Sequence, residues 1–279
     1  MSTTIDNPML AAVRSVPSHF TLGFDAANGV GESLRGQVDA QVVICGMGGS
    51  AFPGDILSTV LGDRGPTISV SRDYSLIAPP CSSKPLVIVS SFSGNTEETI
   101  ASYHHARELG HSVAIVTAGG KLAELAKADK IPCCILSKPF PTFQPRAAAG
   151  MFVAAFLRII SNAGLVPASD EVVRELLDTG RSLEKSAMEA EERGRQMASA
   201  LKDRVPVVYA NAPYAEAVAK IAKIKFNENS KCPAFYGEIP ELNHNEMVGF
   251  TRLSDRFQVI VVTDDGALAR NQTRVQTTI

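Results

Sequence analysis

Five short apolar runs, separated by stretches that suit helices, constrain the fold of this chain more than any other feature. The runs are rich in Val and Ile and show little polar alternation, which is typical of strands covered on both faces. Their ranges are 41–45, 67–71, 86–90, 112–117 and 132–136. Helix-compatible segments lie at 97–109 and 121–130, and a short helix is expected at 8–16. This alternation predicts a parallel sheet with helices on both sides.

A second α/β pattern follows a proline-rich break. Three prolines within residues 139–145 end regular structure, because proline removes a backbone donor. The elements expected after this break are helices at 147–162, 170–201 and 214–227 and strands at 205–210, 234–237 and 257–263. The chain is thus predicted to hold two doubly wound α/β modules with central parallel sheets, residues 1–146 and 147–279. The second has fewer strands, so we expect it to be incomplete at its C-terminus.

Composition excludes several classes of partner and cofactor. The 279 residues carry 27 basic and 29 acidic side chains, a net charge of −2, which favours neither nucleic acid nor an anionic membrane. The longest apolar stretch, 147–160, is interrupted by Arg158 and too short to span a bilayer, and the N-terminus lacks a secretory signal. The five cysteines include no Cys-x-x-Cys pair, so we expect no zinc site and no disulfide framework. These features predict a cytoplasmic protein without a bound metal.

The loop after the first strand suits an anionic ligand. Its sequence is GMGGSA at 46–51. Glycines let the backbone approach a ligand closely, and their amides can face an anion. The spacing also fits G-x-G-x-x-A, so a dinucleotide-binding oxidoreductase, with Asp73 contacting the ribose, is one interpretation of this loop.

The loop after the third strand favours phosphate over a dinucleotide. SSFSGNTEET at 90–99 places three hydroxyls, those of Ser91, Ser93 and Thr96, around one glycine just before a helix. A helix N-terminus binds phosphate without Lys or Arg, because it holds free N–H groups and a partial positive charge. A plain helix cap at Asn95 or Thr96 is the alternative, but it explains one hydroxyl well and three in six residues poorly.

These two loops together resemble the signature of sugar isomerase (SIS) domains. With FNENSK at 226–231 and PELNHNE at 240–246, the chain resembles one family among them, the bifunctional phosphoglucose/phosphomannose isomerases of bacteria and archaea. The resemblance runs from the N-terminal helix to about Thr263. It implies two SIS-type modules, a homodimer and catalysis without a cofactor. The family's chains continue beyond the strand at 257–263, whereas this sequence ends at Ile279 and is expected to be C-terminally truncated.

The resemblance also implies roles for individual residues. The residues implied to bind the sugar phosphate are Gly49, Ser50, Ser91, Ser93 and Thr96. Glu228 would be the general base and Arg146 would stabilise the enediolate. His244 would open the sugar ring, in its own site or in that of the neighbouring subunit.

These residue types suit an aldose–ketose isomerase, an intramolecular oxidoreductase. A carboxylate can move a proton between neighbouring carbons, a fixed cation stabilises the enediolate, and a histidine titrates in the range that ring opening needs. Taken as single residues, Glu228 also fits a solvated helix-end carboxylate and His244 a hydrogen-bonded loop histidine. We expect glucose 6-phosphate, and mannose 6-phosphate, to interconvert with fructose 6-phosphate through a cis-enediol. The alternative is a non-catalytic regulator that binds a phosphosugar, because such a protein needs the phosphate loops but no base.

Overall fold

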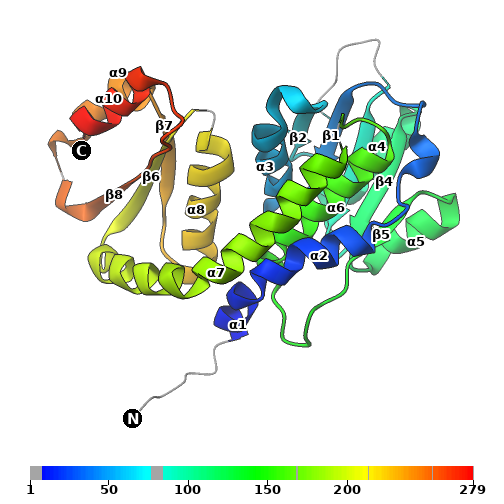
Figure 1. Cartoon of the computed structure of the whole chain (residues 1–279), viewed down its shortest axis with the longest axis horizontal. Coiled ribbons are helices and arrows are strands. Elements are labelled where there is room, and N and C mark those ends of the chain that lie inside the picture. The colour runs from blue at the N-terminus through cyan, green and yellow to red at the C-terminus, as the bar shows by residue number, and fades with distance from the viewer. Residues whose placement is uncertain (1–7, 77–83, 168, 213, 253, 279) are drawn as a thin grey trace. The chain divides into compact units, whose positions relative to one another are not determined.

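The computed structural model describes residues 8–76, 84–167, 169–212, 214–252 and 254–278. The chain forms two compact units, residues 1–187 and 188–279, and each holds a parallel β-sheet (Figure 1). The predicted α/β class with parallel sheets is confirmed. The predicted division after residue 146 falls inside the first unit, because helix α6 (Ala149–Asn162) packs against two other helices of that unit.

The sheet of the first unit has five strands in the order β2-β1-β3-β4-β5. Their bounds are β1 Gln41–Cys45, β2 Thr67–Ser71, β3 Leu86–Ser91, β4 Ser112–Thr117 and β5 Cys133–Ile135, close to the five predicted runs. Strand β1 lies between β2 and β3, and its Cys45 pairs with Ser71 of β2 and Val89 of β3. From β1 the chain goes to β2 on one side, and from β2 it crosses to β3 on the other side of β1. Such a topological switch point is where open parallel sheets bind ligands, beyond the carboxyl ends of the strands.

Helices cover both faces of this sheet. One face packs against α2 (Val16–Ala26), α3 (Phe52–Leu61) and α6, and the other against α4 (Glu97–Glu108) and α5 (Gly120–Asp129). Helix α6 is apolar around nearly its whole circumference and is accordingly buried on nearly all sides. The helix expected at 8–16 is two helices, α1 (Pro8–Arg14) and α2, with Pro17 in the first turn of α2, where proline is tolerated.

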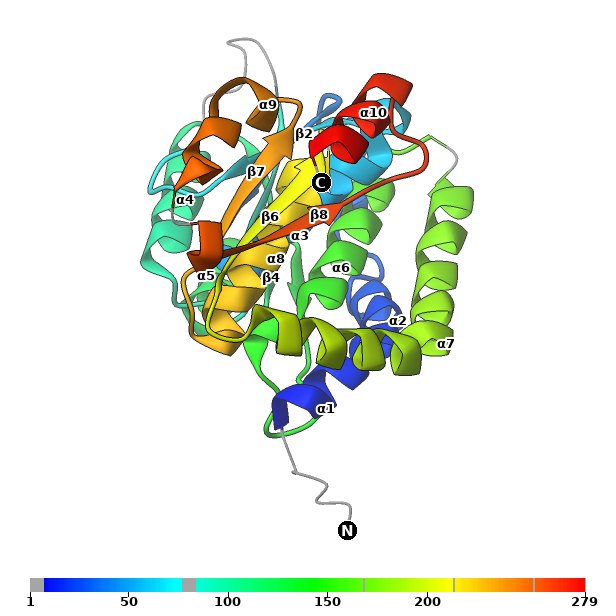
Figure 2. The same ribbon diagram turned by 90° about the vertical axis from the view of Figure 1, so that its left-hand side faces the viewer.

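The second unit begins within α7 (Ser169–Leu201) and has a three-stranded sheet in the order β7-β6-β8, shown side by side in Figure 2. Its strands are β6 Val205–Asn211, β7 Phe235–Ile239 and β8 Phe257–Val262. Helices α9 (Leu242–Asn245) and α10 (Ala269–Thr278) cover one face. The helix predicted at 214–227 covers the other, but as three pieces: π-helix η5 (Ala215–Ala219), α8 (Lys220–Lys225) and π-helix η6 (Phe226–Ser230).

Short 3-10 helices complete the two units. They are η1 Glu32–Leu34, η2 Gly48–Ser50, η3 Gly62–Arg64, η4 Pro145–Ala147, η7 Met247–Thr251 and η8 Ser254–Arg256. Two of them, η2 and η4, lie against each other, and they carry Ser50 and Arg146 respectively.

A buried histidine lies beneath the η4 turn. The side chain of His19 is fully shielded from solvent, its Nε2 lies 2.9 Å from the hydroxyl of Ser15, and its ring meets Phe143 edge-on at 5.4 Å. Burial lowers the pKa of His19 to about 4, and a hydrogen bond with the backbone of Ala147 opposes this shift only in part. The folded protein therefore keeps His19 neutral under conditions in which the unfolded chain is protonated.

The stability of the protein should consequently fall as the pH drops from about 6.5 to about 4. Over that range the unfolded chain binds a proton at His19 and the folded chain does not, which removes about 3 kcal/mol of folding free energy. We expect His19→Gln to flatten this part of the pH profile in urea unfolding followed by circular dichroism. His104→Gln, at an exposed position on α4, is the control and should keep the wild-type slope. Parallel profiles for wild type and His19→Gln would contradict the assignment.

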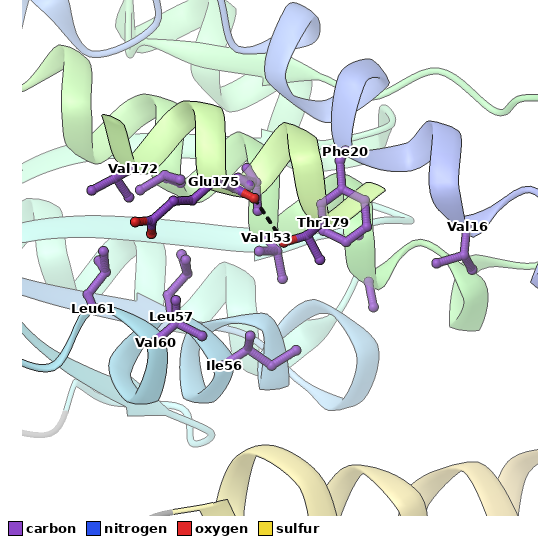
Figure 3. A pocket seen from close by; sticks show the side chains of 14 residues that line it. Val16, Phe20, Ile56, Leu57, Val60, Leu61, Val153, Val172, Glu175 and Thr179 are labelled. Atoms are coloured by element: carbon purple, nitrogen blue, oxygen red, sulfur yellow. Dashed lines mark hydrogen bonds between the residues drawn. The ribbon is translucent and has the colours of Figure 1, made fainter. Parts of the chain in front are cut away.

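An apolar cavity of about 320 Å³ lies among the helices of the first unit. Ile56, Val60, Val153 and Val172, from helices α3, α6 and α7, are among the side chains that line it (Figure 3). Glu175 at its margin pairs with Arg64 over 3.1 Å. The lining is mostly aliphatic, and Glu175 and Thr179 are the polar residues among the described residues that line it.

Filling this cavity should stabilise the first unit. Val153→Ile adds one methylene toward the empty space and should raise the free energy of unfolding by about 1 kcal/mol. The matched control is Val43→Ile, at a strand position buried in the closely packed opposite core. There the same addition should destabilise by roughly 1–3 kcal/mol, because the core must shift to admit it. Equal effects of the two substitutions in thermal or urea unfolding would refute the cavity assignment.

Candidate functional site

The loop after β1 is held tightly against the end of β3. A side chain at Gly46 would bring its Cβ within 2.8 Å of the Ser90 carbonyl oxygen, so only glycine fits there. The hydroxyl of Ser90 donates to the carbonyl of Ser50 over 2.9 Å, and the N–H of Phe92 donates to the Ser50 hydroxyl over 3.2 Å. These bonds place Gly49 and Ser50 beside the next loop of the sheet.

The loop after β3 gathers three hydroxyls at the start of α4. The Ser91 hydroxyl lies 2.8 Å from that of Thr96 and 3.3 Å from that of Ser93. Ser91 is buried, Thr96 half-buried and Ser93 exposed, so the cluster runs from the sheet out to solvent. Thr96 is the N-cap residue of α4, but its side chain makes no capping hydrogen bond. A simple helix cap therefore does not explain these hydroxyls.

A third loop, which sequence reasoning missed, completes this edge of the sheet. It follows β4 and comprises residues 117–121, Thr-Ala-Gly-Gly-Lys. The Thr117 hydroxyl donates to the carbonyl of Gly119 over 2.7 Å, and the N–H of Lys121 donates to Oδ1 of Asn95 over 2.9 Å. Two adjacent glycines directly after a predicted strand were the available signal, since a glycine pair there indicates a close backbone approach.

Arg146 lies beside the loop after β1. It belongs to η4, and a Cβ built on Gly49 would lie 3.8 Å from the Cα of Arg146. Aromatic packing beside the η4 turn supports it: Phe143 packs against both Phe92 and His19. The side chain of Arg146 is only partly buried. The structure therefore brings the arginine and the two hydroxyl-bearing loops together at the switch point of one sheet.

Glu228 lies in the second unit on the π-helix η6. Its Oε2 is shielded from solvent and lies 3.9 Å from Nζ of Lys225. The flanking Asn227 donates from Nδ2 to the carbonyl of Cys232 over 2.9 Å, and Nζ of Lys231 donates to the Glu228 carbonyl over 2.6 Å. π-helical turns inside helices occur frequently at functional sites. These bonds fix the backbone of the π-helical turn, and they leave one carboxylate oxygen of Glu228 shielded from solvent near the Lys225 ammonium.

His244 is exposed on the short helix α9. Two contacts anchor this helix: the hydroxyl of Tyr209 donates to Oε2 of Glu246 over 2.5 Å, and Nδ2 of Asn245 donates to Oε1 of Glu241 over 2.7 Å. Burial raises the pKa of Tyr209, and the hydrogen bond to Glu246 raises it further, so the phenol stays protonated and keeps donating. The ring of His244 thus projects to solvent from a fixed base.

The second unit does not bring Glu228 and His244 together. Glu228 precedes β7 at the amino end of that strand, and His244 follows it at the carboxyl end. The five residues of β7 themselves span about 15 Å. An acid or base must come within about 3 Å of the proton it transfers. The fold of the second unit alone therefore does not place the two side chains next to each other.

Across the described residues, no helix has both the length and the apolar character needed to cross a membrane. In the same part of the chain, no three His, Cys, Asp or Glu side chains gather closely enough to hold a metal ion.

The chain is similar to several known proteins. Residues 190–279 match the model of the bacterial phospho-glucose isomerase C-terminal SIS domain. A bifunctional phosphoglucose/phosphomannose isomerase of Caldicellulosiruptor bescii is 31% identical, over 97% of this chain and 81% of the relative. A D-glucosamine-6-phosphate 4-epimerase of Sulfolobus acidocaldarius is also 31% identical, over 81% of this chain and 69% of the relative.

A solved structure shares the fold across nearly the whole chain. The C-terminal domain of glucosamine-fructose-6-phosphate aminotransferase from Francisella tularensis superposes with a TM-score of 0.74 at 15% identity. The match covers 99% of this chain and 81% of that one. The SIS-domain match and the relative at 31% identity both indicate a phosphosugar isomerase. The loops at the switch point agree with this family. The chain belongs to the bifunctional phosphoglucose/phosphomannose isomerase family of phosphosugar isomerases.

Proposed function

We propose that this protein interconverts glucose 6-phosphate, and mannose 6-phosphate, with fructose 6-phosphate through a cis-enediol intermediate. The observation that carries the proposal is the hydroxyl cluster of Ser91, Ser93 and Thr96 at the switch point of the first sheet. The turn η4, which holds Arg146, lies against the neighbouring loop after β1. The residues of the cluster are those expected to bind a sugar phosphate in this family. Membership of the family supports the same reaction class.

Neutral groups bind the phosphate in this proposal. Gly49 and Ser50 supply the loop after β1, and the three hydroxyls supply the loop after β3. The first turn of α4 adds backbone N–H groups and the positive end of the helix dipole. These two loops contain no lysine or arginine, and the proposal assigns the charge that develops during the reaction to Arg146 of the neighbouring turn.

Glu228 performs the proton transfer. Its carboxylate removes the proton from C2 of the open-chain aldose, and the electron pair of that C–H bond forms the C1–C2 double bond of the enediolate. Arg146 stabilises the negative oxygen. The hydroxyl proton on O2 then passes to O1, the carbon-bound proton returns to C1, and the oxygen on C2 becomes the carbonyl. The reaction is redox-neutral overall, since one carbon is oxidised as its neighbour is reduced, and it needs no cofactor.

His244 opens the ring, and we propose that it does so in the site of a neighbouring subunit of a homodimer. The placement of Glu228 before β7 and of His244 after it supports this arrangement, since the two groups lie at opposite ends of that strand. We further propose that the two modules are both of the SIS type.

The decisive test is an assay of fructose 6-phosphate conversion to glucose 6-phosphate, coupled to a dehydrogenase. Glu228→Gln should reduce kcat by about a hundredfold or more, the usual scale for a lost general base. The control is Glu189→Gln, which removes an exposed carboxylate on α7 that pairs only with Arg193 at the surface, and it should leave turnover unchanged. Wild-type turnover that survives Glu228→Gln would contradict the assigned base.

The same assay separates the proposal from its alternatives. Binding of fructose 6-phosphate without turnover would favour a phosphosugar-binding regulator. Thermal protection by NAD(P) and none by fructose 6-phosphate would favour the dinucleotide interpretation of the loop after β1. The epimerase relative makes glucosamine 6-phosphate the third ligand to test, with epimerisation at C4 as its readout.

Mixing two inactive variants tests the shared site. Glu228→Gln and His244→Ala should each be nearly inactive alone. Once their subunits have exchanged, a mixed dimer holds one site with both defects and one site with neither, so turnover should return. If His244 acts only within its own chain, every site keeps one defect and the mixture stays inactive. A mixture of Glu228→Gln with Arg146→Ala provides a comparison, because both of these groups are proposed to act on the enediolate.

A further inference from the structure

The hydroxyl loop after β3 and the loop after β4 fit into each other through their glycines. Gly94 has a φ of +69°, and a Cβ on it would lie 1.8 Å from the carbonyl oxygen of Gly119. Gly120 also has a φ of +69°, and a Cβ on it would lie 2.2 Å from the carbonyl oxygen of Ser93. Each glycine thus makes room for a carbonyl of the opposite loop.

Hydrogen bonds join the two loops along their length. The N–H of Ala118 donates to the carbonyl of Phe92, and the N–H of Leu122 donates to the carbonyl of Gly94, both over 3.0 Å. Oδ1 of Asn95 accepts the N–H of Lys121 over 2.9 Å. Lys121 lies in the first turn of α5, where backbone N–H groups have no partner within the helix. Asn95 therefore caps α5 rather than α4, the helix that it precedes in the sequence.

Asn95 lies between the hydroxyls that the proposed function assigns to phosphate. Its own N–H donates to the hydroxyl of Ser93 over 3.2 Å, and Thr96 follows it directly. The side chain that reaches across to Lys121 thus restrains the backbone that orients Ser93 and Thr96. We infer that Asn95 is a positioning residue, which holds the hydroxyl loop in its phosphate-binding shape through the loop after β4.

The neutral character of the loop makes this positioning important for affinity. The Coulomb attraction between a lysine and a phosphate declines only gradually with distance. A hydrogen bond from a hydroxyl or an amide weakens steeply when its length or angle changes. A site built from neutral donors therefore depends on the donors being in place before the ligand binds.

The inference rests on the proposed function and is tested through phosphate affinity. Asn95→Ala should raise KM for fructose 6-phosphate, and the inhibition constant of inorganic phosphate, by about tenfold, the scale of one lost hydrogen bond. The value of kcat should stay within about twofold, because the proposed base and enediolate cation are untouched. Asn28→Ala, which removes an amide that accepts from Arg158 elsewhere on the first unit, is the matched control.

A variant on the opposite loop separates positioning from direct contact with the ligand. Thr117→Val removes the bonds of the Thr117 hydroxyl to Gly119 and keeps the shape of a buried side chain. It should raise both constants by roughly threefold, in the same direction as Asn95→Ala. A loss of affinity in Asn95→Ala with none in Thr117→Val would mean that Asn95 contacts the phosphate itself. Wild-type affinity in both variants would also overturn the inference. Failure of the wild type to bind phosphate or fructose 6-phosphate would instead contradict the proposed function.

Discussion

Close backbone approach at the carboxyl edge of the first sheet is the constraint on which the candidate site depends. Gly46 contacts the end of β3, and Gly94 and Gly120 fit against carbonyls of neighbouring loops at distances that exclude any side chain. Three loops from three adjacent strands therefore form one packed layer. A parallel sheet aligns its carboxyl ends, so the loops after β1, β3 and β4 meet at one edge, and the order of the strands determines which loops are neighbours.

If this layer binds the sugar phosphate as proposed, the two hydroxyl-bearing loops do so without a lysine or arginine of their own. Their donors are hydroxyls and backbone amides, which attract an anion only at short range and in the correct direction. Packing supplies that direction, since hydrogen bonds join the loop after β3 to the loop after β4. The lysine of the loop after β4, Lys121, pairs through Nζ with Glu124 over 3.3 Å. The proposal therefore assigns charge on the sugar to Arg146, the arginine of the neighbouring turn.

Much of the first unit could be predicted from the sequence, because buried parallel strands have a strong local signature. All five apolar runs are strands, and the residues of both predicted loops lie at their carboxyl ends. The loop after β4 was missed because its place in the layer depends on a contact between residues 26 apart in the sequence. In this contact the N–H of Lys121 donates to Oδ1 of Asn95. The two π-helical turns around α8 were missed because residues 214–227 match a continuous helix. The distance between Glu228 and His244 was also not predictable, since it follows from the direction of β7 and not from their spacing of 16 residues.

The two units contribute chemically different groups, and this difference has a consequence for assembly. The first supplies neutral donors and one arginine, whereas the titratable candidates, Glu228 and His244, lie at opposite ends of a strand in the second. A general acid and a general base that work on one sugar must lie within a few ångströms of adjacent atoms. Glu228 and His244 lie at opposite ends of β7, so the proposal that both act on one sugar favours a site that takes its histidine from another chain. In that case the oligomer would be a requirement of the reaction as well as a source of stability.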